Sequence, residues 1–309
     1  MRTFPQTVTT VVALVAAAAF LINAAPVTQQ GTKDAPSPQE VLDAAPPAAW
    51  RDVPADDLVV MTLADGSIVD YQLAPDFAPV HVANIRQLVR SGYFDGASIL
   101  RVQDNYVVQW GRPDEDKTEA KGINAVPPAE YDLPANSLAH AGLQLKALPY
   151  RDAYAKHVGH IKSWPVASDG THDWLIHCYG MIGVARDVPP DTGSGTQLYT
   201  IIGHAPRHLD RNLAVVGRIV SGMDVLADRP RGSEDLGFYK DDTQRIKIVS
   251  AKMASDMATG RPAFQILDSA TPVFDAWLKA KANRSGAFFV RPAGAVDICN
   301  VLPPYRSQP

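Results

Sequence analysis

Basic residues are scarce in this sequence, since 29 Lys and Arg face 33 Asp and Glu in 309 residues. The formal net charge of −4 and a pI of about 6.0 leave no basic footprint, so nucleic acid is excluded as an expected partner. Binding to another anionic surface would need a local basic patch, and none stands out. The apolar content of 46% is nevertheless enough for a full core in one domain with extensions.

Cysteine is almost absent as well, because Cys178 and Cys299 are the only two. An oxidising compartment would permit a disulfide between them, and this bridge would tie the C-terminal tail to the core. In the alternative, Cys178 is a small buried hydrophobe just ahead of the apolar run Tyr179 to Ala185. The sequence leaves both interpretations open.

No uninterrupted apolar run reaches the roughly 20 residues that a membrane-spanning helix requires. The run Val11 to Ile22 follows Arg2 and precedes the small residues Asn23-Ala-Ala25, a pattern typical of an export signal. A membrane anchor is the less favoured alternative, and the lack of a cysteine directly after the run argues against a lipid-attached form. We expect residues 1–24 to be a signal peptide. The alanine-rich run favours a bacterial periplasm over an extracellular space, with no stable membrane insertion after cleavage.

The next segment, residues 25–57, is rich in Pro, Ala, Gln and Asp and predicts a flexible leader with one short helix near Pro38 to Ala44. Asp65-Gly66 then separates two strand-like runs and predicts a tight hairpin. After it, Pro79 suits the first turn of a helix, and Gly92 suits its left-handed end.

Short strand-like runs with Gly or Pro between them follow along the chain. They are Ser98 to Arg101, Tyr106 to Gln109, Met181 to Ala185, Leu198 to Ile202, Ala214 to Ile219 and Arg245 to Lys252. Many short strands with one or two helices predict a mainly β fold, a closed antiparallel barrel.

Three segments of these runs form an ordered set. The first, Ser98 to Gly111, places Arg101 and Gln109 eight residues apart in a mostly apolar stretch. The others are Gly183-Val-Ala-Arg186 with Gly193 to Ile202, and His208 to Asp224. Together they resemble the cyclophilin family of peptidyl-prolyl cis-trans isomerases from about Leu58 to about Met253.

The resemblance implies a barrel of about eight strands capped by two helices, the second at Gly222 to Ala227. It implies an enzyme that accelerates rotation about Xaa-Pro bonds in exported polypeptides, with Arg101 as the electrostatic catalyst and Gln109 holding the arginine and the substrate backbone. No cofactor or metal is needed for this chemistry. We expect a monomer whose partners are proline-containing polypeptide substrates.

The resemblance also implies a substrate groove. The residues at matching positions are Tyr106, Val107, Ala185, Arg186, Gln197, Tyr199, His208 and Leu213. Several depart from the usual family pattern: Tyr replaces Phe at 106 and 199, Val replaces Met at 107, and Leu replaces His at 213. His208 stands where many members place tryptophan. The predicted site therefore keeps its charge but changes its lining.

Two segments have no counterpart in the family. Val126-Pro-Pro-Ala-Glu-Tyr131 resembles a segment of some bacterial members, but residues 133–173 form an unmatched insertion, expected as a long loop. Residues 254–309 form a second unmatched piece, with a helix at Pro272 to Ala282 capped by Thr271. We expect this C-terminal extension to pack on the barrel.

Some of these residues also have plainer structural interpretations. An arginine in a half-buried strand can be a structural ion-pair partner, and Tyr106 and Tyr199 can be plain core packing. The histidines at 157, 160, 172 and 177 lack the spacing of a zinc site and are expected as solvated loop residues. Gly193-Ser-Gly-Thr196 lacks both the lysine of a phosphate loop and the order of a nucleophile elbow. The alternative function is a catalytically weak peptide-binding chaperone or interaction module with the same fold.

Overall fold

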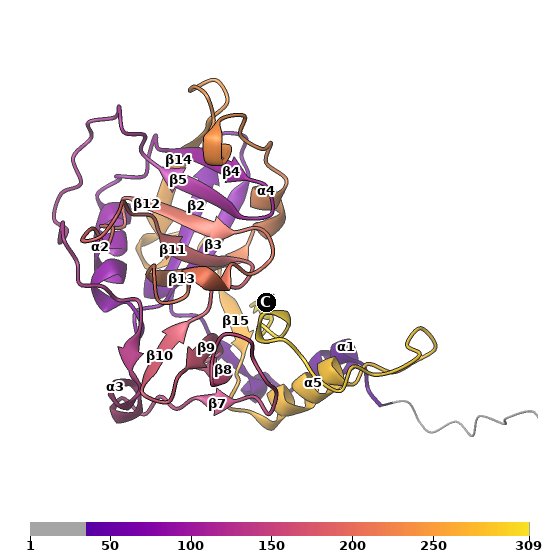
Figure 1. The fold of residues 1–309 in the computed structure, drawn as a ribbon. Coiled ribbons are helices and arrows are strands. Elements are labelled where there is room, and N and C mark those ends of the chain that lie inside the picture. Colours follow the sequence, from indigo (N-terminus) through magenta and orange to yellow (C-terminus); the bar gives the residue numbers. More distant parts are fainter. Residues whose placement is uncertain (1–34, 309) are drawn as a thin grey trace, which may run out of the picture. The chain divides into compact units, whose positions relative to one another are not determined.

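An antiparallel barrel of eight strands forms the centre of the computed structural model, which describes residues 35–308 (Figure 1). The strands follow one another around the ring in the order β11-β12-β5-β4-β14-β2-β3-β13, and β13 pairs with β11 to close it. Their bounds are β2 (Leu58–Leu63), β3 (Ile68–Leu73), β4 (Ser98–Gln103), β5 (Val107–Gly111), β11 (Met181–Val184), β12 (Gln197–Ile201), β13 (Val215–Ser221) and β14 (Ile246–Met253). The predicted closed barrel is confirmed, whereas the expected signal peptide lies outside the described residues.

Two helices accompany the barrel, and Figure 1 shows them on opposite sides of it. The first, α2 (Pro79–Arg90), starts with proline as expected. It ends where the N–H groups of Gly92 and Tyr93 bond to the carbonyls of Val89 and Leu88, and Gly92 takes a φ of +72° that favours glycine. The second is α4 (Met223–Ala227), whose Leu226 is fully buried in the barrel core.

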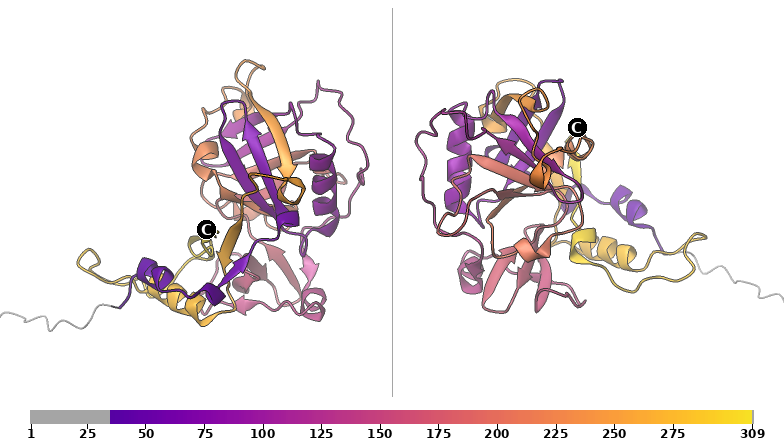
Figure 2. Two further views of the ribbon diagram at one scale, coloured as in Figure 1. Left: turned by 180° about the vertical axis from the view of Figure 1, so that it is seen from behind. Right: turned by 45° about the horizontal axis from the view of Figure 1, so that its top comes forward.

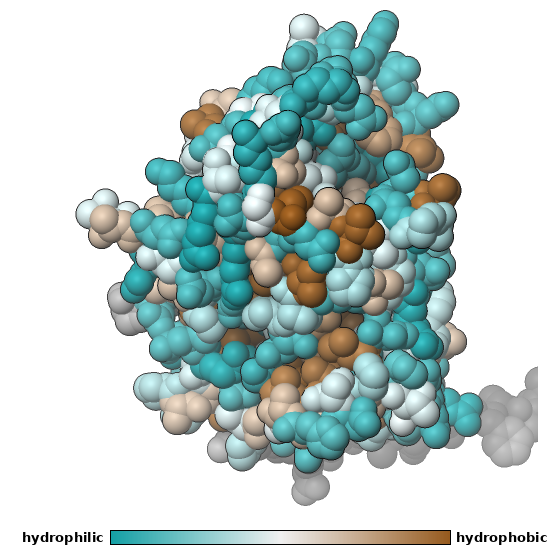
Figure 3. All heavy atoms as spheres, turned by 90° about the vertical axis from the view of Figure 1, so that its left-hand side faces the viewer, coloured by the Kyte–Doolittle hydropathy of each residue, from teal (hydrophilic) through white to brown (hydrophobic). Residues whose placement is uncertain are grey.

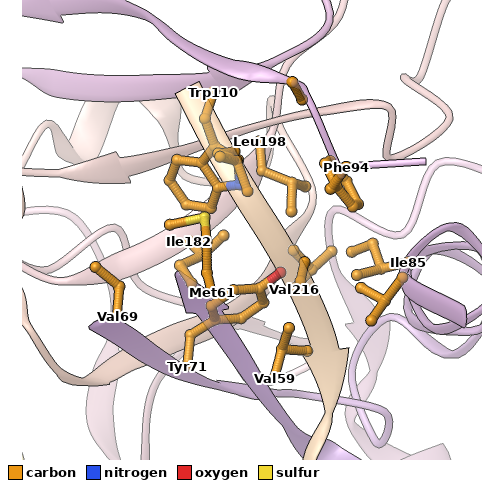
Figure 4. Packing of buried hydrophobic residues seen from close by; sticks show 14 of the residues in the cluster. Val59, Met61, Val69, Tyr71, Ile85, Phe94, Trp110, Ile182, Leu198 and Val216 are labelled. Carbon is orange, nitrogen blue, oxygen red and sulfur yellow. The ribbon is translucent and has the colours of Figure 1, made fainter. Parts of the chain in front are cut away.

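Large apolar side chains fill the interior of the barrel (Figure 4). Trp110 and Tyr71 are fully buried with their ring centroids 6.1 Å apart, and Met61 and Ile182 belong to the same cluster. On the face drawn in Figure 3, by contrast, apolar residues form separate patches within a mostly hydrophilic surface. A filled barrel of this size has no room for a ligand inside, so a binding site has to lie on its outer face.

The insertion between residues 133 and 173, expected as a long loop, folds instead as a five-stranded sheet in the order β6-β10-β9-β8-β7. Its elements are β6 (Leu133–Pro134), α3 (Ala135–His140), β7 (Lys146–Ala147), β8 (His157–Ile161), β9 (Trp164–Ser168) and β10 (His172–Leu175). The hairpin of β8 and β9 could not be recognised in the sequence, because its turn uses Lys162 and Ser163 at φ +46° and +64°. Such turns normally carry Asn or Gly.

A third sheet joins the two ends of the described chain in the order β1-β15-β16 (Figure 2). Its strands are β1 (Trp50–Asp52), β15 (Phe264–Leu267) and β16 (Tyr305–Ser307), and α1 (Pro38–Asp43) contacts α5 (Pro272–Ala282). The expected helices are therefore present, and the Thr271 side chain accepts a hydrogen bond from Phe274 at the start of α5. The described part of the expected flexible leader, residues 35–57, is not a flexible leader, since β1 pairs with a strand more than 200 residues away.

Short 3₁₀ helices link these elements. They are η1 (Pro47–Ala49), η2 (Ala55–Asp57), η3 (Arg207–Leu209), η4 (Asp235–Gly237), η5 (Ala254–Asp256) and η6 (Ile298–Asn300). Within residues 35–308, none of the helices combines the length and the apolar character that crossing a membrane would take.

A second apolar core lies where the insertion, the C-terminal extension and the barrel strands β11 and β13 meet. Cys178 and Cys299 form a disulfide in this core, which joins the barrel to the extension across 121 residues of sequence. In the chain-entropy model, closing a loop of that size stabilises the fold by about 4 to 5 kcal/mol. The extension thus packs on both the barrel and the insertion.

Arg218 of β13 sits at the centre of this junction. Its guanidinium carbon lies 4.2 Å from the ring centroid of Trp164 in the insertion and 4.7 Å from that of Tyr305 in the extension. The same side chain, only 3% exposed as a residue, donates a 2.8 Å hydrogen bond to the carbonyl of Ser163. One buried cation between two aromatic rings therefore connects all three parts.

The expectation of solvated loop histidines is wrong for two of the four. His160 is 1% exposed, its Nε2 lies 3.0 Å from the carbonyl oxygen of Val301, and burial lowers its pKa to about 3. His177 is also 1% exposed. His160 packs against Phe274 of the C-terminal extension, and His177 packs against Tyr199. In the described part of the chain, no group of three or more His, Cys, Asp or Glu is placed to hold a metal ion.

The buried carboxyl of Asp70 should make the stability of the fold depend on pH. It is 6% exposed on the outer face of β3, its Oδ1 has no hydrogen-bond partner among the described residues, and burial raises its pKa to about 6. A raised pKa means that the carboxyl contributes stability at pH values below about 4, which is lost as pH rises through about 6. We expect Asp70→Asn to raise the thermal midpoint at pH 7, with little difference from wild type at pH 4. Equal pH profiles of the two proteins in a calorimetric series would contradict this.

Candidate functional site

A β-bulge in β4 decides where the Arg101 side chain lies. The register between β4 and β5 shifts between Ile99 and Arg101, so that Leu100 is an extra residue. Ile99 and Val102, three positions apart, both belong to the barrel core. Regular alternation from Ile99 would turn Arg101 inward. The bulge instead puts Leu100 and Arg101 together on the outer face, where both line the same groove.

Arg101 is held by neutral groups. Its Nε donates to the carbonyl of Leu236 at 2.5 Å, one terminal nitrogen donates to Gln103 Oε1, and the other reaches Gln109 Oε1 at 3.4 Å. The guanidinium carbon lies 5.3 Å from the ring centroid of Phe238 and 5.7 Å from that of Tyr106.

No Asp or Glu of the described residues pairs with Arg101, and burial lowers its pKa. An arginine nevertheless stays protonated in proteins. The groove therefore contains a fixed positive charge that no neighbouring carboxylate neutralises.

Gln109 links this charge to the next strand. It lies opposite Arg101 across β4 and β5 and opposite Tyr199 across β5 and β12. Its Nε2 donates to Gln197 Oε1 at 2.8 Å, and Gln197 Nε2 donates to the carbonyl of Arg112 at 2.9 Å. This succession fixes which way each amide points, so Gln109 offers its oxygen to Arg101 and keeps one N–H for another acceptor.

The groove itself has a volume of about 620 Å³. All the residues predicted for the site line it except His208. They are Arg101, Tyr106, Val107, Gln109, Ala185, Arg186, Gln197, Tyr199 and Leu213. His208 is exposed outside the groove, with its ring 6.3 Å from that of Tyr106 and 9° from parallel. The structure thus gathers residues from four separated segments around one depression.

The apolar part of the groove is a small cluster outside the barrel. Val107, Tyr199 and Ile201 are buried in it, with Tyr106, Ala185 and Leu213 packed against them. Because the cluster lies next to the Arg101 guanidinium, one compact apolar group can be held here while a polar neighbour reaches the charge.

Sequence reasoning missed the wall formed by Leu236 and Phe238, which line the groove beside Arg101. Phe238 forms an isolated bridge with Arg101, and Leu236 takes a φ of +59° that is unusual for leucine. The segment has no apolar periodicity, so no sequence signal marked it. Leu209 and the Pro113–Glu115 turn also line the groove and were not predicted.

Tyr199 lies flat across the neighbouring strand. It pairs directly with Gly183, and a Cβ added at Gly183 would clash with the tyrosine oxygen and ring. That oxygen is also 2.9 Å from Nε2 of His177. Burial raises the pKa of Tyr199 well above 10, so the hydroxyl remains protonated. The ring is therefore fixed both along its face and at its tip.

This close approach generates a prediction. We expect Gly183→Ala to displace Tyr199 and to lower the free energy of unfolding by about 1 to 3 kcal/mol, the usual range for overpacking. Truncating the tyrosine removes the clash, so the loss in Gly183→Ala/Tyr199→Ala should be smaller than the sum of the two single losses in denaturant titrations. Strictly additive losses would show that the two side chains do not compete for the same space.

Comparisons with known proteins agree on one family. A family model described as "Cyclophilin type peptidyl-prolyl cis-trans isomerase/CLD" matches residues 58–253. A probable peptidyl-prolyl cis-trans isomerase of Brucella suis is 27% identical over 202 residues, which cover 65% of this chain and 84% of that protein. Peptidyl-prolyl cis-trans isomerase B of Bacillus subtilis is 34% identical over 85 residues, 26% of this chain and 59% of that protein.

Among solved structures, cyclophilin AquaCyp293 from Hirschia baltica superposes with a TM-score of 0.63 at 24% identity. The superposition covers 84% of this chain and 93% of that one. The likeness therefore extends beyond the 58–253 match, although at this identity it shows the fold alone.

Proposed function

This chain belongs to the cyclophilin-type peptidyl-prolyl cis-trans isomerase family, and on that premise we propose that Arg101 catalyses rotation about Xaa-Pro bonds by stabilising the twisted amide. Rotation meets a barrier of about 18 to 20 kcal/mol because amide resonance has to be lost. A catalyst lowers this barrier only through contacts that are stronger in the twisted state than in the planar one.

A fixed guanidinium meets that requirement. Twisting removes the conjugation between nitrogen and carbonyl, and the proline nitrogen gains a lone pair that can accept a hydrogen bond. A cation placed beside the bond stabilises this charge distribution more than that of the planar amide. The observation that carries the proposal is the Arg101 guanidinium at the edge of the apolar cluster, held by neutral acceptors.

The remaining groove residues suit an extended polypeptide. The cluster of Val107, Tyr199 and Leu213 would take the proline ring, while the free N–H of Gln109 would bind a backbone carbonyl of the substrate. Arg186 also lines the groove, and its three side-chain nitrogens donate to the backbone carbonyls of Asn212 and Asp187. We assign it a supporting role in holding the substrate main chain.

Exported polypeptides are the proposed substrates. The apolar run Val11 to Ile22 behind Arg2 supports export, and the disulfide between Cys178 and Cys299 suits an oxidising compartment such as the periplasm. We propose that the mature protein acts there as a monomer.

Arg101→Ala tests the proposal. We expect it to lower kcat/KM by about 100-fold, as removal of one preorganised charge donor commonly does, and Arg101→Lys to recover little because lysine lacks the planar fork. The exchange rate of a short Ala-Pro peptide, measured by NMR with and without enzyme, gives the result.

Arg90→Ala is the matched control, because Arg90 forms exposed ion pairs on α2 away from the groove. It should retain wild-type exchange rates. Peptide binding without acceleration in wild type would overturn the catalytic role of Arg101 and would favour a peptide-binding chaperone.

A further inference from the structure

Behind the groove, a chain of polar side chains leads from Tyr199 into the insertion. Nε2 of His177 is 2.9 Å from the Tyr199 hydroxyl, and Nδ1 of His177 is 3.0 Å from Asp210 Oδ1. The other oxygen of Asp210 accepts from Arg207 Nε at 2.6 Å. The two terminal nitrogens of Arg207 then bind both carboxylate oxygens of Asp152 at 2.9 and 3.1 Å.

Each link has a defined direction. Asp210 Oδ1 accepts from the backbone N–H of His177 and faces Nδ1 of the same residue, so the Nδ1–H tautomer satisfies it. Nε2 is then an acceptor, and the Tyr199 hydroxyl is its donor. Burial alone would raise the pKa of Asp210, but the hydrogen bond from His177 and the charge of Arg207 outweigh burial and lower it. Asp210 therefore stays ionised and keeps this tautomer in place.

The four side chains behind Tyr199 are almost fully buried, although Asp152 and Arg207 also line a second depression of the surface. Side-chain exposure is 1% for His177, 7% for Asp210, 5% for Arg207 and 4% for Asp152. None of these four lines the groove, whereas Tyr199 does. Any effect that they have on a substrate must therefore pass through the tyrosine.

The far end of this row of polar side chains, Asp152, belongs to the insertion. Asp152 lies between β7 and β8, and its Oδ1 also accepts from the backbone N–H groups of Tyr154 and Ala155. The Tyr154 ring covers Arg207, with its centroid 4.8 Å from the guanidinium carbon. Asp152 is thus locked by its own turn, and it can hold Arg207 in one orientation.

We propose that His177, Asp210, Arg207 and Asp152 are positioning residues that tether the Tyr199 hydroxyl, and that the insertion thereby fixes the floor of the proline pocket. The inference rests on the proposed function, since it assumes that the proline ring packs on Tyr199. While the bond turns, the ring has to remain still as the preceding residue rotates. A tethered floor holds it still, so loss of the tether lowers kcat more than it raises KM.

A double-mutant cycle tests the tether. His177→Leu and Tyr199→Phe each break the same hydrogen bond, and each should lower kcat by about 10-fold, within the usual range for a residue that orients a functional group. Because both remove one interaction, the double variant should lose about 10-fold and not about 100-fold. The measurement is kcat and KM by NMR exchange on an Ala-Pro peptide. Losses that multiply, or single variants with wild-type kcat, would overturn the proposal.

Asp152→Asn tests the distant end, and Asp76→Asn is its control. Asp76, between β3 and α2, also forms an ion pair with the insertion, through Lys162 at 2.9 Å. It has no hydrogen bond to the network that ends at Tyr199. We expect Asp152→Asn to lower kcat several-fold and Asp76→Asn to leave it unchanged. Equal effects of the two would mean that the insertion acts only through stability.

The tether can also be read without catalysis, which separates it from the role of Arg101. Nε2 of His177 accepts from the Tyr199 hydroxyl, so its nitrogen chemical shift should change in Tyr199→Phe even if Arg101→Ala retains full activity. An unchanged shift would overturn the tether whatever the outcome for Arg101.

Discussion

Closure of the barrel is the constraint on which the rest of this structure depends. Eight strands leave an interior that Trp110, Tyr71 and their neighbours fill completely, so chemistry has to take place on the outside. Strand alternation would then turn Arg101 into the core, where burial of an unpaired charge is strongly destabilising. The extra residue at Leu100 resolves this conflict, because it moves the arginine outward while Ile99 and Val102 stay inside.

For the proposed function, the guanidinium also has to remain available to a substrate. A carboxylate partner would stabilise it but would also compete with any polarised amide for the same N–H groups. The structure uses weaker neutral acceptors and two aromatic rings, Tyr106 and Phe238, which hold the side chain without cancelling its charge. The partial desolvation that lowers the pKa of Arg101 also strengthens its field in the groove.

Much of this could be predicted from the sequence because the signals are local. Asp65-Gly66, Pro79 and Gly92 mark turns and helix ends through backbone conformation, and the spacing of Arg101 and Gln109 matches a known family. The bulge at Leu100 could not be predicted, since it shows only in the pairing of β4 with β5. The strand at Trp50–Asp52 was missed for a related reason: its partner is Leu267, and pairing over that separation leaves no local trace.

In the proposed arrangement, buried polar contacts let the insertion act on a groove that it does not line. Apolar packing in the second core tolerates small shifts, whereas the bidentate Arg207–Asp152 pair and the Arg218 stack satisfy their geometry in one arrangement. Such contacts add little net stability, because each charge gives up its hydration on burial. Their effect is on orientation. Once Arg207 is held in one orientation, its hydrogen bond orients Asp210, Asp210 orients His177, and His177 holds the Tyr199 hydroxyl. The result in the groove is an aromatic ring with a fixed orientation.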